Sequence, residues 1–213
     1  MPKFFAASPN YSMLAAPAVA YGGGVWVVVF ANTQTALTSS DNGATWISRQ
    51  LPVTANWFRV IYANGRFMAF AGGTAAGASG SNMCWSLDGI LWVMANTSPA
   101  ACWWKGIAYD GTVATYKTVM VGGAAAATTG TLCSRSSDGA VTWGAAATLN
   151  ASAEWIDVAS SGAGRFVAIA GGTAAGTLTG YSTDGNNWSA GGARASSQWV
   201  SIAYGSSKFL AVS

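Results

Sequence analysis

The sequence predicts an all-β fold, a β-propeller that we expect to have five blades, and three observations support this prediction. First, a Ser/Thr-x-Asp motif that ends in Trp recurs around Asp41, Asp88, Asp138 and Asp184, at spacings of 47, 50 and 46 residues. Second, short runs of branched and aromatic residues, bounded by Gly, lie between the motifs, as expected for strands. Third, no segment has a clear helical period. A repeat of this length that holds four strands is the unit of a propeller blade.

The composition excludes several classes of protein. Of the 213 residues, 51% are hydrophobic and 8% are charged, with 27 Gly, 11 Trp and no His. Aromatic and branched residues are too abundant for a disordered chain, and the Gly residues lack the period of collagen. The longest uninterrupted apolar run, residues 25–31, has seven residues and is too short to span a membrane. We therefore expect a globular protein without membrane insertion.

The charged residues and the cysteines limit the kinds of partner and cofactor that we expect. The net charge is +3, and the ten basic residues are scattered, so we expect no nucleic-acid partner. Cys84, Cys102 and Cys133 form no CxxC pair, and without His they cannot complete a Cys/His zinc site. We interpret them as small buried hydrophobic residues, with a disulfide between two of them as the alternative, and expect no metal and no cofactor. The N-terminal residues lack the apolar stretch of a secretion signal, which predicts synthesis in a cytoplasm without a signal peptide.

Each repeat is expected to contain four strands. The first starts at a Trp that recurs along the chain, as Trp57, Trp104, Trp155 and Trp199. The second follows a tight turn, which Asn-Gly favours because both residues tolerate a positive φ. The third leads into the Ser-x-Asp motif, and the fourth begins near the Trp that ends the motif. Motifs one to four are residues 39–46, 86–92, 136–143 and 182–188.

The chemistry of the motif explains its composition. The Asp carboxylate can accept backbone N–H groups of its own turn, and Gly adopts a positive φ without steric cost. The Trp starts the outgoing strand and buries a large apolar surface between sheets. The motif residues to which we give this structural role are Asp41, Gly43, Trp46, Asp88, Gly89, Trp92, Asp138, Gly139, Trp143, Asp184, Gly185 and Trp188.

The motif resembles the Asp-box, or BNR, repeat of sialidase-like propellers over nearly the whole chain. Motifs one and three match that repeat best, whereas motifs two and four are one residue shorter and lack the Thr. In that family the box is a structural turn far from the active site. The resemblance therefore implies that the four motif aspartates have no catalytic role.

The repeat predicts how the ring closes. First and second strands pair near five positions, and the motif occurs four times. Counting back 16 residues from Tyr21, as Trp46 precedes Tyr62, places residues 3–6 where a fourth strand belongs. This predicts one domain, residues 1–213, with repeats at about 12–51, 52–99, 100–150, 151–195 and 196–213, the last completed by residues 1–11. Closure of this kind removes exposed sheet edges. The last blade is still one strand short, so either it has three strands or the natural chain continues beyond Ser213.

The residues argue against a sialidase-like hydrolase, although the resemblance implies that alternative. Sialidases hold the substrate carboxylate with three arginines and use a Tyr nucleophile assisted by Glu, with an Asp acid/base. Here Arg66 and Arg165 share one repeat position, which favours a role in the repeat. Outside the motifs only Asp110, Glu154 and Asp157 carry carboxylates, and we interpret the last two as solvated or turn residues. Without His, a Ser-His-Asp triad is impossible. We expect no catalytic residues.

Two non-enzymatic functions remain, and they can coincide. Trp57, Trp104, Trp155 and Trp199 could stack on sugars near one face of the ring; the alternative is that they pack between blades. A surface of small uncharged residues suits burial in a larger assembly, and this composition resembles propellers on bacteriophage virions. We therefore predict a structural and adhesion module of a virion surface or tail fibre. Its partners would be other virion proteins, copies of itself and cell-surface glycans. The second hypothesis is a free lectin, and the third is the sialidase-like hydrolase.

Overall fold

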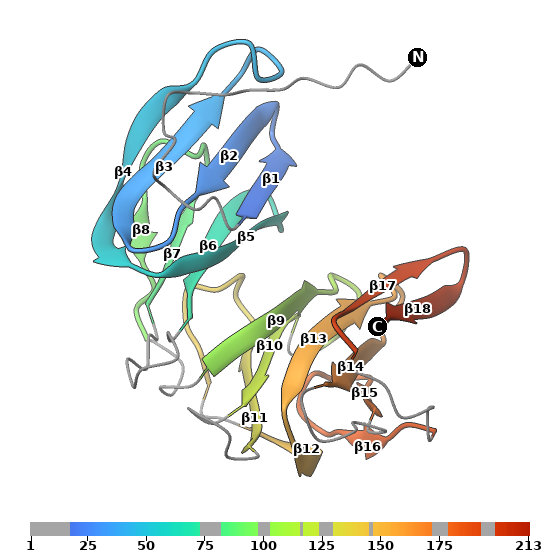
Figure 1. Cartoon of the computed structure of the whole chain (residues 1–213). Helices are drawn as coiled ribbons and strands as arrows, with labels where there is room; N and C mark the ends of the chain where they lie inside the picture. Colours follow the sequence, from blue (N-terminus) through green and yellow to red (C-terminus); the bar gives the residue numbers. More distant parts are fainter. Residues whose placement is uncertain are drawn as a thin grey trace. The chain divides into compact units, whose positions relative to one another are not determined.

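A computed structural model describes residues 18–72, 82–97, 103–115, 117–123, 130–144, 147–171, 179–192 and 199–213. The described residues contain antiparallel strands and turns and no helix, so none of them forms a helical membrane span (Figure 1). The all-β prediction is therefore confirmed. The N-terminal residues that are predicted to close the ring lie outside the described residues.

The chain divides into two compact units, each of which is described here by itself. Unit 1 comprises residues 1–72 and 82–95, and unit 2 comprises residues 73–81 and 96–213. The strands of unit 1 are β1 (Ala18–Gly22), β2 (Val25–Val29), β3 (Thr33–Ser39), β4 (Ile47–Ala55), β5 (Trp57–Ala63), β6 (Arg66–Ala71), β7 (Met83–Ser86) and β8 (Val93–Met94). Those of unit 2 are β9 (Trp103–Tyr109), β10 (Thr118–Gly123), β11 (Gly130–Ser136), β12 (Ala147–Ala153), β13 (Trp155–Ser160), β14 (Phe166–Ala170), β15 (Thr179–Ser182), β16 (Ser189–Ala190), β17 (Ser201–Gly205) and β18 (Lys208–Val212).

Every sheet joins strands that are consecutive in the sequence. Among the described residues, four sheets have four strands each, β1–β4, β5–β8, β9–β12 and β13–β16, and the fifth is the hairpin β17–β18. As predicted, the first strands β5 and β13 begin at Trp57 and Trp155. The fourth strand β4 begins directly after Trp46. Strand order and motif spacing thus agree, because each of the first four repeats forms its own four-stranded sheet.

Within unit 1, the two sheets pack face to face. Trp57, Val60 and Phe67 of sheet β5–β8 meet Val27 and Val29 of sheet β1–β4 in one apolar cluster. The Trp57 indole Nε1 also donates a hydrogen bond to the carbonyl of Thr33, 3.1 Å away. We call the side of a sheet that packs on the preceding sheet its front face, and the opposite side its back face.

The same arrangement occurs twice in unit 2. Trp155, Val158 and Phe166 on the front face of sheet β13–β16 pack against the back face of sheet β9–β12. The front face of hairpin β17–β18 then packs on the back face of sheet β13–β16, where Ile202 meets Ile169. A fully buried large side chain stabilises such an interface by a few kcal/mol.

First strands of neighbouring sheets approach so closely that one of them carries Gly. A Cβ added at Gly106 in β9 would lie 2.6 Å from the Cα of Asp157 in β13. Real Cβ atoms do not reach such distances, so only Gly fits this backbone contact. The first strands β9 and β13 are thus in direct backbone contact.

Candidate functional site

Each of the four motifs forms a turn in which Ser and Asp bind one another and the backbone. In motif one, the Ser39 hydroxyl donates to Asp41 Oδ1 at 2.8 Å and accepts the amide of Gly43 at 2.8 Å. Asp41 also accepts the amide of Thr45 at 2.9 Å and its hydroxyl at 2.6 Å. The corresponding Ser-Asp hydrogen bonds in the other motifs join Ser86 to Asp88, Ser136 to Asp138 and Ser182 to Asp184.

The longer motif one has two turn residues with positive φ, whereas the shorter motif two has one. Motif one is longer than motif two and places both Asn42 and Gly43 in the left-handed region, at φ 57° and 87°. Motif two needs only Gly89, at φ 78°. In motif one the indole Nε1 of Trp46 donates to the Gly43 carbonyl, which joins the end of the motif to its turn.

The motif carboxylates are held in their ionised form. Hydrogen bonds from the Thr45 side chain, the Thr45 amide and Ser39 lower the pKa of Asp41 to about 2. For Asp88 the Ile90 and Leu91 amides lower the pKa. Burial raises the pKa of Asp138 and Asp184, but hydrogen bonds from Thr142 and Asn187 outweigh this effect and the pKa of each is lowered. A carboxylate engaged in this way suits a structural turn better than proton transfer at neutral pH.

The other two aspartates join neighbouring sheets of unit 2. Asp110 follows β9 and accepts the hydroxyl of Ser160, at the end of β13, at 2.8 Å and the amide of Gly164, in the turn between β13 and β14, at 3.0 Å. Asp157 in β13 accepts the hydroxyl of Ser201 at 2.8 Å and the amide of Ile202 at 3.0 Å, both from β17. Asp157 is buried, so its interpretation as a solvated or turn carboxylate is wrong. No sequence pattern marks these contacts, because their partners lie 44 to 54 residues away.

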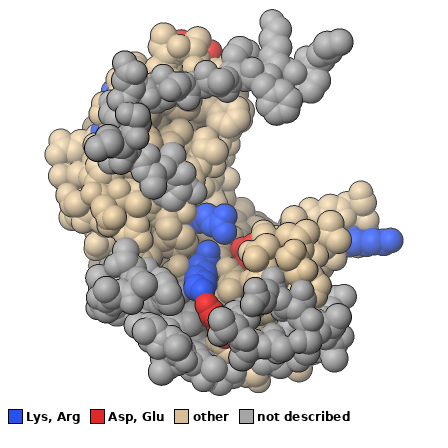
Figure 2. All heavy atoms as spheres, viewed as in Figure 1, with Lys and Arg blue, Asp and Glu red and all other residues tan. Residues whose placement is uncertain are grey.

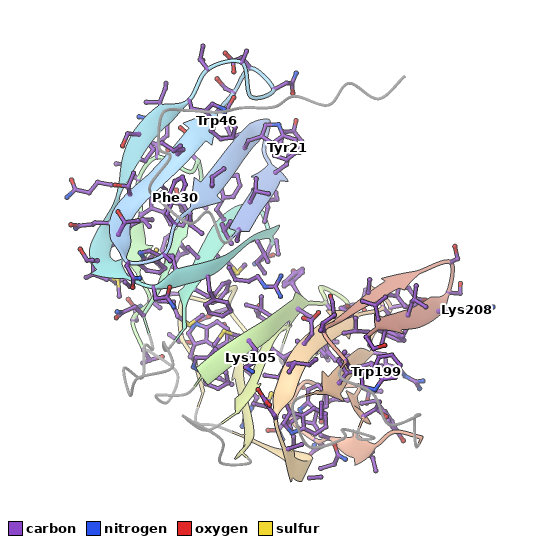
Figure 3. All side chains as sticks on the ribbon, in the orientation of Figure 1. Tyr21, Phe30, Trp46, Lys105, Trp199 and Lys208 are labelled. Carbon is purple, nitrogen blue, oxygen red and sulfur yellow. The ribbon has the colours of Figure 1, made fainter. Side chains whose placement is uncertain are left out.

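Glu154 and the repeated arginines have partners of their own. Glu154, just before β13, forms an ion pair with Lys105 of β9. Lys105 is labelled in Figure 3. Arg66 lies over the ring of Trp85 at 4.8 Å, and Arg165 lies over Tyr181 at 5.4 Å. Arg66 is the first residue of β6 and Arg165 directly precedes β14, and each stacks on an aromatic residue of the third strand. Their shared repeat position predicts a role in the repeat, and the stacking is that role.

Three of the four recurrent tryptophans are too deeply buried to stack on a sugar. Trp57 and Trp155 are 0% exposed and Trp104 is 2% exposed. An indole ring without exposed surface cannot stack on a sugar, so the glycan-binding expectation is wrong for these three residues, and packing between sheets accounts for them. Trp199 is half-buried. Trp199 precedes the hairpin β17–β18, which has two strands among the described residues, whereas Trp57, Trp104 and Trp155 lie in four-stranded sheets.

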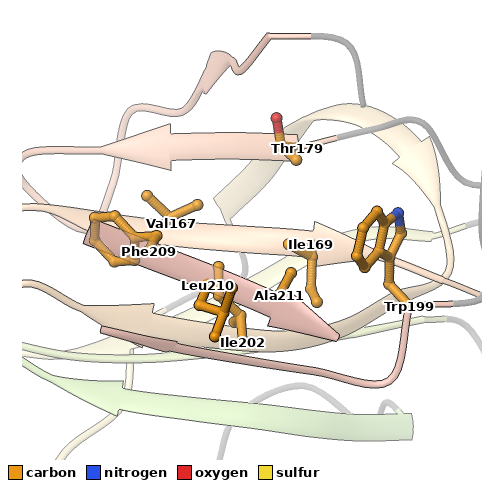
Figure 4. A pocket seen from close by; sticks show the side chains of 8 residues that line it. All are labelled: Val167, Ile169, Thr179, Trp199, Ile202, Phe209, Leu210 and Ala211. Atoms are coloured by element: carbon orange, nitrogen blue, oxygen red, sulfur yellow. The ribbon is translucent and has the colours of Figure 1, made fainter. Parts of the chain in front are cut away.

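Trp199 lines a cavity of about 150 Å³ between hairpin β17–β18 and sheet β13–β16 (Figure 4). Thr179 is the one polar residue among the described residues that line it, and the Thr179 hydroxyl donates to the carbonyl of Gly192. Sugar-binding sites need several polar groups that converge on the ligand, so this wall selects an apolar group. The lining residues are Val167, Ile169, Thr179, Trp199, Ile202, Phe209, Leu210 and Ala211.

Motif two carries an apolar patch that the sequence analysis missed. Leu87 is 64% exposed, Ile90 43%, Leu91 74% and Val93 48%, all within one turn and the strand that follows it. In motif one, Ser40 takes the place of Leu87, and Thr45 takes the place of Leu91. Comparing the four motifs position by position would have shown this difference. We call these four residues the motif-two patch.

No group of three or more His, Cys, Asp or Glu in the described part of the chain could hold a metal ion. Cys84 and Cys133 are buried thiols without a disulfide, and burial raises the pKa of both, to about 12 for Cys133. Cys102 lies outside the described residues. Charged side chains are sparse on the face shown in Figure 2, in keeping with the composition.

Comparisons with known proteins show the fold. No protein-family model matches the chain, and no curated protein matches it. Among solved structures, virginiamycin B lyase from Staphylococcus aureus superposes with a TM-score of 0.70 at 9% identity, over 93% of this chain. YCF48 bound to D1 peptide superposes with a TM-score of 0.63 at 16% identity, over 90% of this chain. An ancestral GH74 enzyme superposes with a TM-score of 0.60 at 14% identity, over 89% of this chain. These neighbours are β-propeller-like, so the chain has a propeller fold.

The chain is shorter than these neighbours. It covers 62% of the lyase, 57% of YCF48 and 27% of the GH74 enzyme. At such low identities the likeness extends to the fold alone. The number of blades and the closure of the ring stay predictions.

Proposed function

We propose that this protein is a non-enzymatic structural and adhesion module on the surface or tail of a virion, where apolar contacts bind it to other proteins. The motif-two patch is the observation that carries the proposal. Four aliphatic side chains at one turn contribute little to the fold when they face water, and clustered exposure of this kind is typical of a protein-binding surface.

Composition supports the same conclusion. A chain with 8% charged residues and a mean hydropathy of +0.32 has few charges to keep it dispersed as a free protein. Burial of part of its surface in an assembly removes this difficulty. A cytoplasm as the place of synthesis and a virion as the destination are parts of this proposal.

The adhesive contacts are with protein rather than with host glycans. Three of the four tryptophans proposed for sugar stacking are buried, and the fourth lines an apolar cavity. The enzymes among the structural neighbours share the fold at 9–14% identity, which favours neither hydrolysis nor lyase chemistry here.

Sedimentation of the native material from its source tests the proposal. We expect the chain to sediment with a large particle and to be released by detergent, because apolar contacts hold it. Intact-mass analysis of the released chain shows whether it ends at Ser213. Sedimentation as a free protein of about 22 kDa would overturn the proposal.

A matched pair of variants identifies the contact. L87S/L91T gives motif two the residues that motif one has at those positions, and we expect it to abolish cosedimentation while the fold is kept. Thr183→Ala changes the position in motif four that corresponds to Leu87 and serves as the control. Equal cosedimentation of both variants would remove the motif-two patch from the proposal.

A further inference from the structure

Among the described residues, no strand pairs with the edge of β18 that faces away from β17, which we call its free edge. The carbonyl of Val212 accepts the amide of Val200 at 2.9 Å, so Val212 directs its backbone toward β17. Backbone groups alternate in direction along a strand, and Phe209 and Ala211 therefore direct their N–H and C=O groups away from β17. In the part of the chain that the structure describes, β18 pairs with β17 alone.

The complete sheets show what belongs at this edge. In each of them the second strand pairs with an antiparallel third strand, as β14 does with β15 and β6 does with β7. Strand β18 is the second strand of its repeat and lacks that neighbour among the described residues. The edge is thus a place where one more strand continues an established pattern.

The cavity lies beside this edge (Figure 4). Phe209 and Ala211 direct their side chains to the front face, toward sheet β13–β16, and both line the cavity. A residue that pairs with either of them directs its side chain to the same face. A cavity of about 150 Å³ with apolar walls holds a small apolar side chain.

A positive charge marks one end of the edge. Lys208 starts β18 and is exposed, and it has no ion-pair partner within the described ranges (Figure 3). The C-terminal end of an antiparallel partner strand lies beside Lys208, because Lys208 is at the N-terminal end of β18. Charge complementarity therefore requires a carboxylate at the C-terminal end of the partner.

We propose that the free edge of β18 is an acceptor site for an extended peptide strand of another protein. The peptide pairs antiparallel with Phe209 and Ala211, places an apolar side chain in the cavity beside Trp199, and sets a carboxylate at its C-terminal end against Lys208. Main-chain hydrogen bonds supply affinity in this type of recognition, and the cavity and the charge supply specificity. This site is separate from the motif-two patch and does not depend on it.

A synthetic peptide tests the site on the full-length chain. The probe is fluorescein-Ser-Val-Thr-Val-Ser-Asp with a free C-terminus, and fluorescence anisotropy measures its binding. We expect saturable binding and slower hydrogen exchange at the Phe209 and Ala211 amides when the peptide is present. No binding, or binding without a change in exchange at these two amides, would overturn the proposal.

Two variants separate backbone pairing from charge. Ala211→Pro removes an outward N–H and leaves the bonds between β17 and β18 intact, so we expect about tenfold weaker binding. Lys208→Glu should bind this probe several-fold more weakly, and its affinity should recover with a probe that ends in Lys amide. Val212→Thr, at an exposed position of β18 that directs its backbone toward β17 and does not line the cavity, is the matched control. Equal binding by all three variants would contradict the predicted pairing.

One further result would also overturn the proposal. The chain itself could fill the edge, as the predicted closure by residues 1–11 implies. In that case the Phe209 and Ala211 amides are protected from exchange in the full chain before any peptide is added. Phe5→Asp, in the segment 3–6 that is predicted to form the closing strand, then accelerates their exchange. An external strand instead requires fast exchange at these two amides in the free protein.

Discussion

In unit 2, sheet β13–β16 and hairpin β17–β18 start from similar sequences and have different surroundings. Strand β14 contains Phe-Val-Ala-Ile and β18 contains Phe-Leu-Ala-Val. Four of the five residues of β14 are buried, whereas none of the five residues of β18 is. The comparison shows that an alternating apolar pattern makes a strand suitable for burial, and that the neighbouring sheets determine whether burial occurs.

The largest expected difference concerns the two tryptophans that precede these strands. Trp155→Ala removes a fully buried side chain between two sheets, and we expect a loss of about 3–5 kcal/mol in the free energy of unfolding. Trp199→Ala enlarges a cavity that is already open, so we expect about 1–2 kcal/mol. Urea denaturation measures both values. Equal losses would contradict the idea that the hairpin is incompletely packed.

Asp157 tests how the hairpin is attached to the sheet. Asp157→Ala leaves the Ser201 hydroxyl and the Ile202 amide without this acceptor, and we expect a loss of about 1–3 kcal/mol. Hydrogen exchange should accelerate in β17 and β18 far more than in β14. Ser201→Ala removes one of the two bonds and is the milder control. Uniform acceleration across unit 2 would mean that the carboxylate stabilises the whole unit.

Sheet β13–β16 and the hairpin should also differ in their response to acid, because the sheet contains motif four and the hairpin contains no motif. The folded-state pKa of Asp184 is lowered below the ordinary value of 3.8, and its stabilising contribution is therefore present above about pH 4. It is lost as the pH falls below 4 through the folded-state pKa, which for Asp41 in motif one is about 2. Hydrogen exchange between pH 5 and pH 2, corrected for intrinsic rates, should show the motif-four turn opening first. Asp184→Asn should remove that pH dependence.

The smallest expected effect is on the exposed face of the hairpin. Leu210 is 69% exposed, so Leu210→Thr should change the free energy of unfolding by less than about 0.5 kcal/mol. Ile169→Thr, at a buried position of β14, should cost about 2 kcal/mol or more. Thermal unfolding of the two variants provides the measurement. A large loss for Leu210→Thr would show that another part of the chain covers this face.

Sequence reasoning was most successful where the structure is local. The Asp41 turn follows from residues within seven positions of one another, because the carboxylate and hydroxyl groups reach only the nearby backbone. Strand order followed as well, since neighbouring strands in each sheet are consecutive along the chain. The shared roles of Arg66 and Arg165 were predictable from their repeat position alone.

The candidate sites were harder to predict. The sequence showed that Trp155 and Trp199 are equivalent in the repeat, but it could not show that one is buried and the other lines a cavity. The contact of Asp157 with β17 depends on the distance between first strands of different sheets, which composition and spacing do not specify. The motif-two patch was visible in the sequence, and comparison of the motifs for exposed apolar residues would have found it.

The sequence by itself determined the all-β class, the four-strand repeat and the turns, because these depend on local hydrogen bonding and on alternation along a strand. Only the tertiary structure decided which tryptophans are buried, which carboxylates join sheets and which strand edge has no neighbour among the described residues. Each of these depends on what lies beside a strand in space. The physical reason is that burial and pairing are properties of two surfaces in contact, and a repeated sequence describes only one of them at a time.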